Sequence, residues 1–387
     1  MTTKLPDAGR TTRLSPFGFL AGVVLSFAAC CLAGYQSSRQ NLYQDFERFH
    51  VFISPETYHY PTASHVLEVG RHELDRDKIA VVVGGNSILN GVGQGAGHIW
   101  SNHLREELGD DYRVVNLSMR GAYSFEFAGE AFAALSQEYP RILYVTMVPL
   151  NAGAIDGGTY RYLLWDSYHH GLTSPGREEL VHKLRDYYKG REEHAELERQ
   201  MWLDQWFHSR ALWNTISYHW FSSVYHPILA SKSTLPRQSW KDPEAFFESR
   251  PFEQRFRPDT LEAEMRIVKG VASLGPLWSG DSPQPVQTLK AALPEHLHSS
   301  VLFLGVPDCR YYTDQLEPHD REAYAKTLKL RVEQLDRAGF ASMQVGGTWN
   351  TDEYNDRCHL SPLGGKRLAE EVAPEIKKLA KKLGYTK

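Results

Sequence analysis

Short apolar runs alternate with amphipathic segments in two parts of the chain, and this alternation constrains the fold more than any other feature. The run at residues 79–83 is continuously apolar and is followed by Gly84 and Gly85, which is typical of a strand buried on both faces of a parallel sheet. The same pattern predicts four more strands and three helices, which alternate as in βαβ units. The predicted strands are residues 112–117, 141–148, 301–306 and 340–345, and the helices are residues 96–108, 125–137 and 320–338. An α/β fold with a parallel sheet and helices on both faces follows.

A final helix is predicted to begin at Ser361 and Pro362. Serine is a favoured N-cap, and proline is favoured at the first helical position. Pro374 is expected to kink this helix. Its apolar residues fall on one face, which we expect to be buried: Leu368, Val372, Ile376, Leu379 and Leu383.

The alternation is lost between residues 152 and 294, a stretch rich in aromatic and charged residues. We interpret it as a large, mainly helical insertion in one α/β domain. Its tryptophans are spaced four, seven and seven residues apart, which places them on one stripe of a helix: Trp202, Trp206, Trp213 and Trp220. Such a stripe usually packs on the main domain, and we expect that here. A lid, a membrane-facing belt and a glycan-stacking surface are the alternatives.

Residues 14–38 carry no charge and are mostly apolar. At about 1.5 Å per residue, a helix of this length crosses a hydrocarbon layer of roughly 30 Å. We expect an uncleaved transmembrane anchor. The alternatives are a signal peptide cut after Ala33 and a lipoprotein modified at Cys30.

Basic residues precede the apolar segment, so the positive-inside rule predicts a cytoplasmic N-terminus and an extracytoplasmic main domain, periplasmic or extracellular: Lys4, Arg10 and Arg13. The chain then divides into a cytoplasmic N-terminus, an anchor, a linker, the first part of the α/β domain, the insertion and the second part of that domain. These are residues 1–13, 14–38, 39–78, 79–151, 152–294 and 295–387.

The overall composition excludes two classes of protein. A net charge of −4 provides no basic field to hold nucleic acid through counterion release, so nucleic acid is not an expected partner. A mean hydropathy of −0.44 excludes a polytopic membrane protein but leaves room for one spanning segment.

Cysteine usage fits an exported domain. Cys30 and Cys31 lie inside the apolar segment, so only Cys309 and Cys358 remain for the rest of the chain. Two exported cysteines without a competing third predict one disulfide. Two unpaired thiols are the alternative.

Polar residues and glycines follow the predicted strands. Ligands in doubly wound sheets bind outside the carboxyl ends of the strands, which draws attention to Ser87, Gly121 and Asn151 after the first three strands. Asp356 and His359 lie three residues apart on the loop before the last helix.

These residue types fit acyl transfer. A serine hydroxyl needs a base to take its proton, and histidine is the usual base near neutral pH. A carboxylate on the other ring nitrogen fixes the tautomer, which Asp356 can do for His359. The backbone N–H groups of Ser87 and Gly121 and the side-chain amide of Asn151 could bind the oxyanion. Alternatively, Ser87 is only a helix N-cap, His359 an ordinary loop residue, and Gly121 and Asn151 turn formers.

Together these blocks resemble the SGNH (GDSL-type) hydrolase family over residues 79–151 and 300–383. Gly85-Asn-Ser87-Ile-Leu-Asn-Gly91 resembles the family's Gly-Asp-Ser-x-x-x-Gly block, and Asp356-Arg-Cys-His359 resembles its Asp-x-x-His block. Gly121 and Asn151 are placed like the glycine and asparagine blocks. The chain departs from the family at Asn86, where aspartate is usual, and around Asn151, which lacks the neighbouring glycine and aspartate.

The resemblance implies a flavodoxin-like sheet and a triad in which Ser87 is the nucleophile, with Asp356 and His359. It also implies an oxyanion hole made by Ser87, Gly121 and Asn151. With the predicted location, this gives a serine esterase or O-acyltransferase that moves acetyl or another short acyl group on an envelope glycan or lipid, without a cofactor or metal. The alternative is a non-catalytic, membrane-anchored assembly or glycan-binding protein on the same fold. If both cysteines border one cleft, a bridge between Cys309 and Cys358 would clamp the acid–base loop to the sheet.

Motifs of other enzyme classes fit less well. The glycines at residues 91–95 follow the first strand too late for a dinucleotide fingerprint, and no P-loop motif is present. Leu89 stands where the α/β-hydrolase nucleophile elbow needs glycine. The histidines between residues 169 and 226 do not form a zinc-binding helix motif.

Overall fold

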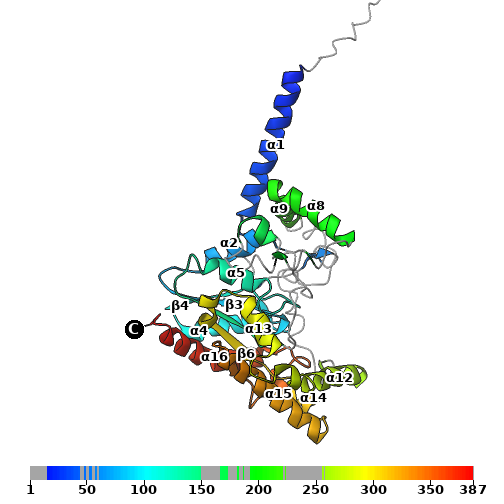
Figure 1. Ribbon diagram of the computed structural model, residues 1–387, viewed down its shortest axis with the longest axis vertical. Coiled ribbons are helices and arrows are strands. Elements are labelled where there is room, and N and C mark those ends of the chain that lie inside the picture. Colours follow the sequence, from blue (N-terminus) through cyan, green and yellow to red (C-terminus); the bar gives the residue numbers. More distant parts are fainter. Residues whose placement is uncertain are drawn as a thin grey trace, which may run out of the picture.

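A computed structural model of the chain describes residues 15–43, 61–149, 166–172, 192–220 and 258–386, with a few positions between them (48, 52–54, 57–58, 181–182, 186, 223 and 255–256). Its centre is a parallel sheet of five strands in the order β4-β3-β5-β6-β7 (Figure 1). In chain order this is 2-1-3-4-5, one of the common doubly wound arrangements. The strands are β3 (Ile79–Val83), β4 (Tyr112–Asn116), β5 (Ile142–Met147), β6 (Val301–Gly305) and β7 (Ala341–Gln344). All five predicted strands are confirmed, with ends shifted by one residue at most.

Both faces of the sheet are buried, because successive side chains of a strand point to opposite sides. In β3, Ala80 and Val82 join one apolar cluster, and Val81 and Val83 join another. Helices α2 (Ala63–Glu73) and α5 (Ala128–Leu135) pack in the first cluster. Helices α4 (Trp100–Leu108) and α16 (Pro362–Lys382) contact each other and pack in the second (Figure 1). The structure confirms an α/β domain with helices on both faces.

Two predicted helices are shorter than expected. The helix expected at residues 96–108 is a 3-10 turn, η1 (Ala96–His98), followed by α4, because Ile99 is extended. The helix expected at residues 125–137 is α5, which begins only after Phe127, whose φ is +54°.

The two helices near the C-terminus follow the prediction closely. Helix α15 (Pro318–Arg337) begins two residues before its predicted start. In α16 the Ser361 hydroxyl accepts a hydrogen bond from the Gly364 N–H at 3.3 Å, and Pro362 is the first helical residue. The helix continues through Pro374, and its predicted apolar face is buried at four positions: Leu368, Val372, Ile376 and Leu379.

The remaining elements are short or belong to the region of the predicted insertion. They are β1 (Phe52–Ser54), β2 (Thr57–Tyr58), α3 (Ser87–Asn90), α8 (Glu192–Phe207), α9 (Ser209–Trp220), η5 (Pro258–Thr260), α12 (Leu261–Ala272), η6 (Gly275–Trp278), α13 (Gln284–Ala291), η7 (Glu295–Ser300), α14 (Arg310–Thr313) and η8 (Thr351–Glu353). Helix α12 packs on α15, so the chain from η5 onward lies against the α/β domain.

The predicted packing of the tryptophan stripe on the main domain is wrong. The stripe is divided between α8 and α9, because His208 between them has a φ of +43° and breaks the helix. The indoles are 51–66% exposed at all four positions: Trp202, Trp206, Trp213 and Trp220.

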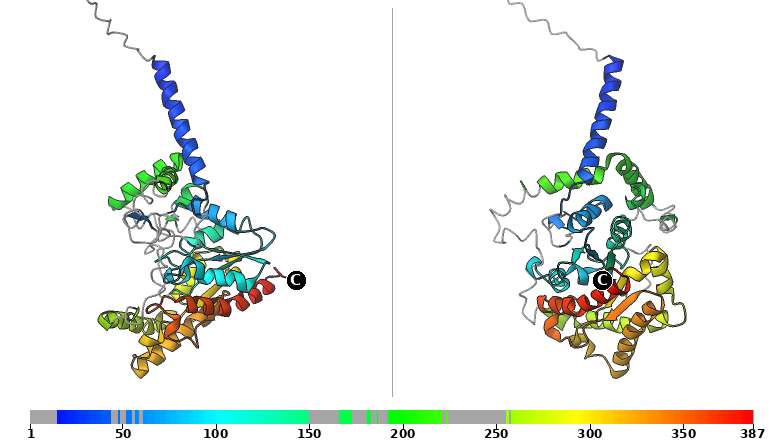
Figure 2. Two further views of the ribbon diagram at one scale, coloured as in Figure 1. Left: turned by 180° about the vertical axis from the view of Figure 1, so that it is seen from behind. Right: turned by 90° about the vertical axis from the view of Figure 1, so that its left-hand side faces the viewer.

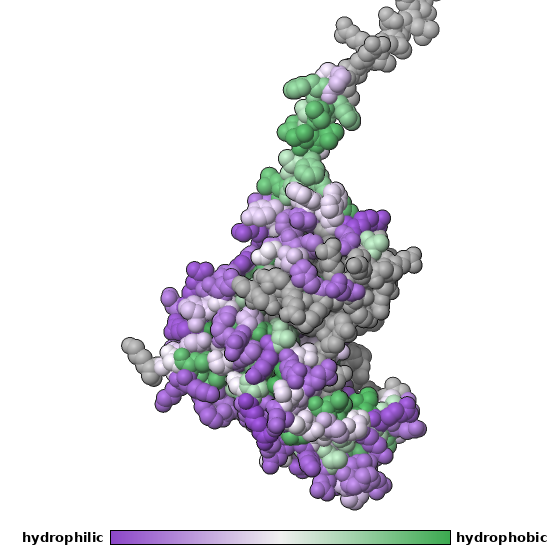
Figure 3. Space-filling view, in the orientation of Figure 1, coloured by the Kyte–Doolittle hydropathy of each residue, from purple (hydrophilic) through white to green (hydrophobic). Residues whose placement is uncertain are grey.

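The N-terminal apolar segment is one long helix, α1 (Pro16–Ser38), which is long and apolar enough to span a membrane. It stands out of the α/β domain as a band of apolar surface (Figures 1 and 3). Its contacts with the rest of the protein include those of its last turns and, in the middle of the helix, that of Phe27 with Phe207. Gly34, Ser37 and Ser38 are buried, and the His65 ring lies 2.9 Å from the Ser37 carbonyl oxygen through Nε2. The views in Figure 2 show the same projection from behind and from the side.

Candidate active site

Ser87 is the first residue of α3, directly after the turn that follows β3. This turn needs glycine at two successive positions. A Cβ on Gly84 would lie 2.1 Å from the Tyr144 hydroxyl, and Gly85 has a φ of +118°. The close turn places Ser87 at the carboxyl end of the sheet, where ligands bind in doubly wound folds.

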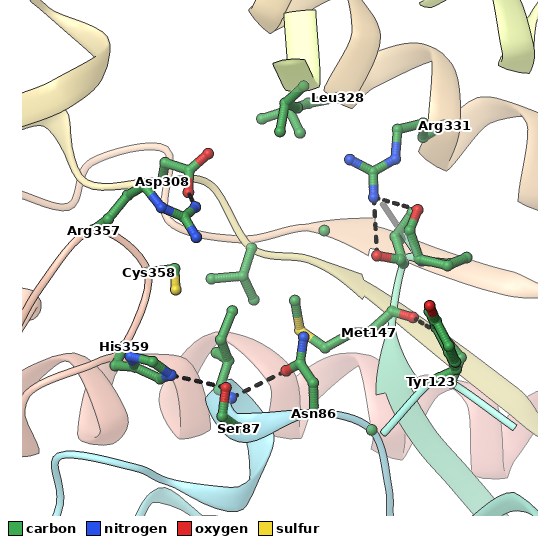
Figure 4. A pocket seen from close by; sticks show the side chains of 18 of the residues that line it. Asn86, Ser87, Tyr123, Met147, Asp308, Leu328, Arg331, Arg357, Cys358 and His359 are labelled. Atoms are coloured by element: carbon green, nitrogen blue, oxygen red, sulfur yellow. Dashed lines mark hydrogen bonds and ion pairs between the residues drawn. The ribbon is translucent and has the colours of Figure 1, made fainter. Parts of the chain in front are cut away.

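Asn86 is the N-cap of α3. Its side-chain oxygen accepts a hydrogen bond of 3.0 Å from the Ile88 N–H. Asparagine caps helices about as well as aspartate, so the serine turn is capped without an aspartate at this position. Because the oxygen is used for the cap, the amide nitrogen lies toward the cavity in Figure 4.

Asp356 and His359 lie on the loop between η8 and α16. The Asp356 Oδ1 atom accepts hydrogen bonds from the Cys358 and His359 N–H groups at 2.9 and 2.8 Å. Asn355 connects this loop to the segment after α3, because its side chain donates to the Gly93 carbonyl. Its N–H donates to the His359 carbonyl at 2.8 Å, which closes the loop itself. The loop is therefore fixed against the part of the chain that carries the serine.

The three predicted catalytic side chains form one continuous hydrogen-bonded chain, of which Figure 4 shows the contact between Ser87 and His359. His359 Nε2 lies 2.8 Å from Ser87 Oγ, and His359 Nδ1 lies 2.6 Å from Asp356 Oδ2. An ionised carboxylate only accepts, so Nδ1 carries the proton and Nε2 is free to accept the serine proton. The two partners of His359 lie on opposite sides of its ring, as a proton relay from serine to base requires.

Asp356 is ionised at neutral pH. Burial by itself would raise the pKa of its carboxyl, but the hydrogen bond and charge of His359 and two backbone N–H groups outweigh burial and lower the pKa. The negative charge beside the ring stabilises the imidazolium that forms when His359 takes a proton.

Ser87 and His359 border a cavity of about 460 Å³. Gly121, in the segment after β4, lines the same cavity and has a φ of +73°, a conformation that favours glycine. The apolar part of the wall includes Ile88, Met147 and Leu328. Asn151, the third predicted oxyanion donor, lies outside the described residues.

Several charged residues of the cavity were not predicted from the sequence (Figure 4). Asp308 follows β6 and pairs with Arg357, which also contacts Glu264 at 2.7 Å. The Asp308 carboxylate accepts a hydrogen bond of 3.0 Å from the Tyr324 hydroxyl. The sequence signal for Asp308 is its place just after the fourth strand of the sheet, where ligands bind in doubly wound folds.

Arg331 of α15 also lines the cavity and is 3% exposed. It donates to the carbonyl oxygens of Val148 and Pro149 at 2.9 and 2.6 Å, so it holds the chain where it leaves β5. Burial lowers the pKa of its guanidinium to about 10, which keeps the charge at neutral pH. No local sequence pattern marks this residue.

The predicted disulfide is absent, and Cys309 and Cys358 are both free thiols. Burial raises the pKa of each thiol, that of Cys309 to about 12. The two segments are joined instead by a hydrogen bond of 2.7 Å from the Cys309 N–H to the Arg357 carbonyl and by the adjacent ion pair of Arg357 with Asp308. These contacts attach the acid–base loop to the end of β6 without a covalent bond.

Among the described residues, two groups have ligand-type atoms within 4.8 Å of one another: Asp356, Cys358 and His359, and Asp166, His170 and Asp204. In the first group the His359 and Asp356 atoms are already hydrogen-bonded, and burial keeps the Cys358 thiol protonated. In the second group, which sequence reasoning missed, His170 Nε2 lies 3.2 Å from Asp204 and 3.5 Å from Asp166. Both carboxylates of that group are buried.

Comparison of the chain with known protein families, with curated proteins and with solved structures finds no match in any of the three. The chemistry of the site therefore rests on its own geometry.

Proposed function

We propose that the chain is a serine-dependent acyl-ester enzyme, a hydrolase or O-acyltransferase of the SGNH type. The observation that carries this proposal is the hydrogen-bonded chain from Ser87 through His359 to Asp356. Ser87 and His359 are 272 positions apart in the sequence, and both border a cavity at the carboxyl ends of the strands. Such an arrangement needs two distant segments to meet in one orientation, and nucleophilic acyl transfer accounts for all three side chains.

In the proposed mechanism, Ser87 Oγ attacks the ester carbonyl while His359 Nε2 takes the hydroxyl proton. The tetrahedral oxyanion is bound by the N–H groups of Ser87 and Gly121 and by the amide of Asn151, donors that each contribute roughly 3–4 kcal/mol in comparable sites. The imidazolium returns its proton to the leaving alcohol. Water or a second alcohol, deprotonated by His359, then attacks the acyl-enzyme and frees Ser87.

The proposed location follows from α1. As an uncleaved anchor it holds the α/β domain at an extracytoplasmic membrane surface, where acylated envelope glycans and lipids are the available esters. The contact between the Phe27 and Phe207 rings supports an anchor that is retained rather than cut after Ala33, because Phe27 lies before that cut. The apolar cavity wall beside Ser87 suits acetyl or another short acyl group.

Labelling with a fluorophosphonate probe tests the chemistry. We expect the full chain, purified in detergent, to be labelled, because His359 activates the Ser87 hydroxyl. The Ser87→Ala variant should lose the label completely. Ser273→Ala is the matched control, since Ser273 is an exposed serine at the end of α12, and it should label as the native chain does.

The absence of labelling in a natively folded chain would overturn the enzyme proposal. It would favour the non-catalytic alternative, in which the same fold binds a glycan or an assembly partner. Labelling that persists in Ser87→Ala would show that another residue is the nucleophile.

A further inference from the structure

Helices α8 and α9 meet in a sharp corner at His208, and this helix pair is called the hairpin. Its outer surface is defined by exposed aromatic and aliphatic side chains of both helices. On α8, Trp202 and Trp206 are one turn apart and are 59% and 51% exposed. On α9, Trp213 and Ile216 lie on one face and are 66% and 52% exposed. Exposed apolar groups clustered in this way mark an interaction surface rather than chance exposure.

The outer surface of the hairpin carries almost no charge. Within residues 201–220 the charged side chains are Asp204 and Arg210. Asp204 points inward, because it is 3% exposed, lies 3.2 Å from the His170 ring and accepts the Arg210 N–H at 2.8 Å. The first half of α8, by contrast, is rich in glutamate. The tryptophans therefore occupy the part of the hairpin that can leave water at the lowest cost.

The corner of the hairpin packs directly against α1 (Figures 1 and 2). The Phe207 ring meets the Phe27 ring edge-on at 4.9 Å between centroids. The backbones also touch, because a Cβ on Gly34 would lie 1.7 Å from the Phe207 carbonyl oxygen. The corner is thus fixed at a defined height on the apolar helix.

The corner therefore lies beside a part of α1 that has to be inside the membrane if α1 is to span it. The contact at Phe27 is seven residues before Gly34, where the apolar run ends, and seven helical residues are roughly 10 Å long. If the hairpin stayed in water, only residues 16–26 would remain for the membrane, a length of roughly 16 Å against the roughly 30 Å of a hydrocarbon core. Leu32, beyond the contact, is 60% exposed and also calls for an apolar surrounding.

We propose that the corner between α8 and α9 lies in the membrane–water interface, on the side of the membrane that carries the α/β domain. Trp202, Trp206 and Trp213 then sit at the level of the lipid headgroups, where indole rings are favoured because one end is apolar and the N–H is polar. The hairpin is an interfacial helical element beside a spanning helix. The inference rests on the anchoring part of the proposed function and is independent of the serine chemistry.

With both α1 and the hairpin attached to the membrane, the α/β domain has less freedom to tilt than it would have with α1 alone. A single spanning helix leaves a domain free to tilt about the point where the chain leaves the bilayer. The hairpin adds a second contact beside α1, so the sheet and its cavity keep one orientation toward the lipid surface.

Tryptophan quenching by brominated lipid tests the inference. The full chain is reconstituted into phosphatidylcholine vesicles whose acyl chains carry bromine either close to the headgroup or close to the chain end. The test variant is W202F/W206F/W213F, which keeps aromatic rings in the hairpin but removes their emission. The matched control is Trp278→Phe, because Trp278 is fully buried in the α/β domain.

We expect bromine close to the headgroup to quench the native chain more than bromine at the chain end. The triple variant should lose most of this quenching, whereas Trp278→Phe should retain all of it. Equal quenching of the native chain and the triple variant, or none in either, would overturn the inference and leave the surface to a protein or glycan partner.

Alkaline carbonate extraction of the native chain separates this inference from the anchor on which it rests. If the chain stays in the membrane but its tryptophans are not quenched, the interfacial location of the hairpin is refuted and the anchor is not. If the chain is extracted, the anchor is refuted and, with it, the interfacial location of the hairpin.

Discussion

In the described part of the chain, His359 and His170 each form a hydrogen bond with an aspartate. The two pairs lie at different ends of the molecule, and they differ in what faces the imidazole nitrogens. His359 lies at the carboxyl ends of the strands, 2.6 Å from Asp356, and its second nitrogen faces Ser87. His170 lies near the base of α1, 3.2 Å from Asp204, and the same nitrogen faces a second carboxylate, Asp166.

The serines beside the two histidines make opposite contacts. The Ser87 hydroxyl faces an imidazole nitrogen that can take its proton. The Ser209 hydroxyl donates to the Asp204 carboxylate at 3.2 Å. Serine, histidine and aspartate in proximity therefore do not by themselves make a nucleophile, because the imidazole must lie between the hydroxyl and the carboxylate. In one cluster the imidazole lies between a hydroxyl and a carboxylate, whereas in the other a single imidazole nitrogen faces two buried carboxylates.

The largest effect expected from this difference is on catalysis. Asp356→Asn should lower kcat for hydrolysis of an activated ester by roughly 10³–10⁴-fold, because the amide no longer holds His359 in the tautomer that accepts the serine proton. Asp204→Asn is the matched change in the other cluster. It should leave kcat unchanged and lower the free energy of unfolding by about 1–3 kcal/mol, since three hydrogen bonds to a charged acceptor are weakened. Ester hydrolysis and thermal unfolding measure the two effects, and equal kcat losses in both variants would remove the distinction between the clusters.

A smaller effect is expected on the pH dependence of stability. Burial and the charge of Asp204 raise the pKa of Asp166 from 3.8 to about 7. An acid with a higher pKa in the folded chain than in the unfolded chain takes up a proton on folding. Its contribution to the free energy of unfolding therefore falls as the pH rises from 3.8 to about 7. Burial alone would lower the pKa of His170, but its hydrogen bond to Asp204 and the two carboxylate charges raise it, so its contribution is also lost toward higher pH.

Thermal unfolding of the full chain in detergent at a series of pH values measures this dependence. Asp166→Asn removes the titrating acid and keeps an oxygen for the Ala63 N–H, which the Asp166 carboxylate accepts in the native chain. The variant should therefore lose part of the decline in Tm between mildly acidic and neutral pH. A decline equal to that of the native chain would show that Asp166 does not titrate in this range.

The smallest effect is expected for Ser209→Ala. The hydroxyl makes one hydrogen bond to Asp204, so its removal should cost about 1 kcal/mol of unfolding free energy. Fluorophosphonate labelling should be unchanged, in contrast to its complete loss in Ser87→Ala. Reduced labelling of Ser209→Ala would mean that the two clusters are coupled.

The sheet and the triad could be predicted from the sequence because each depends on a local pattern. A strand buried on both faces must be apolar throughout, as residues 79–83 are, and ligand-binding residues follow strand ends. Ser87 is found in this way, and His359 is found by its spacing of three residues from Asp356 on the loop before the last helix. Arg331 could not be found, because it reaches the cavity from the middle of a helix and its role depends on how α15 packs.

The tryptophan stripe shows what helical periodicity in the sequence cannot predict. Helical spacing identifies an apolar face but does not say whether protein or lipid covers it, since both are apolar surroundings. The break at His208, which turns one expected stripe into a hairpin, depends on a φ of +43° that histidine rarely adopts and that no neighbouring residue signals. Cys309 and Cys358 are free although the cysteine count predicts a disulfide, because a count says nothing of the geometry that such a bond also needs.

The sequence separation of 272 residues between Ser87 and His359 makes the order of assembly important. Until the loop before α16 docks beside α3, the serine has no proton acceptor and is no more nucleophilic than an alcohol in water. A nascent or C-terminally truncated chain thus carries an inert hydroxyl. For the proposed enzyme, ester reactivity is consequently a readout of completed folding.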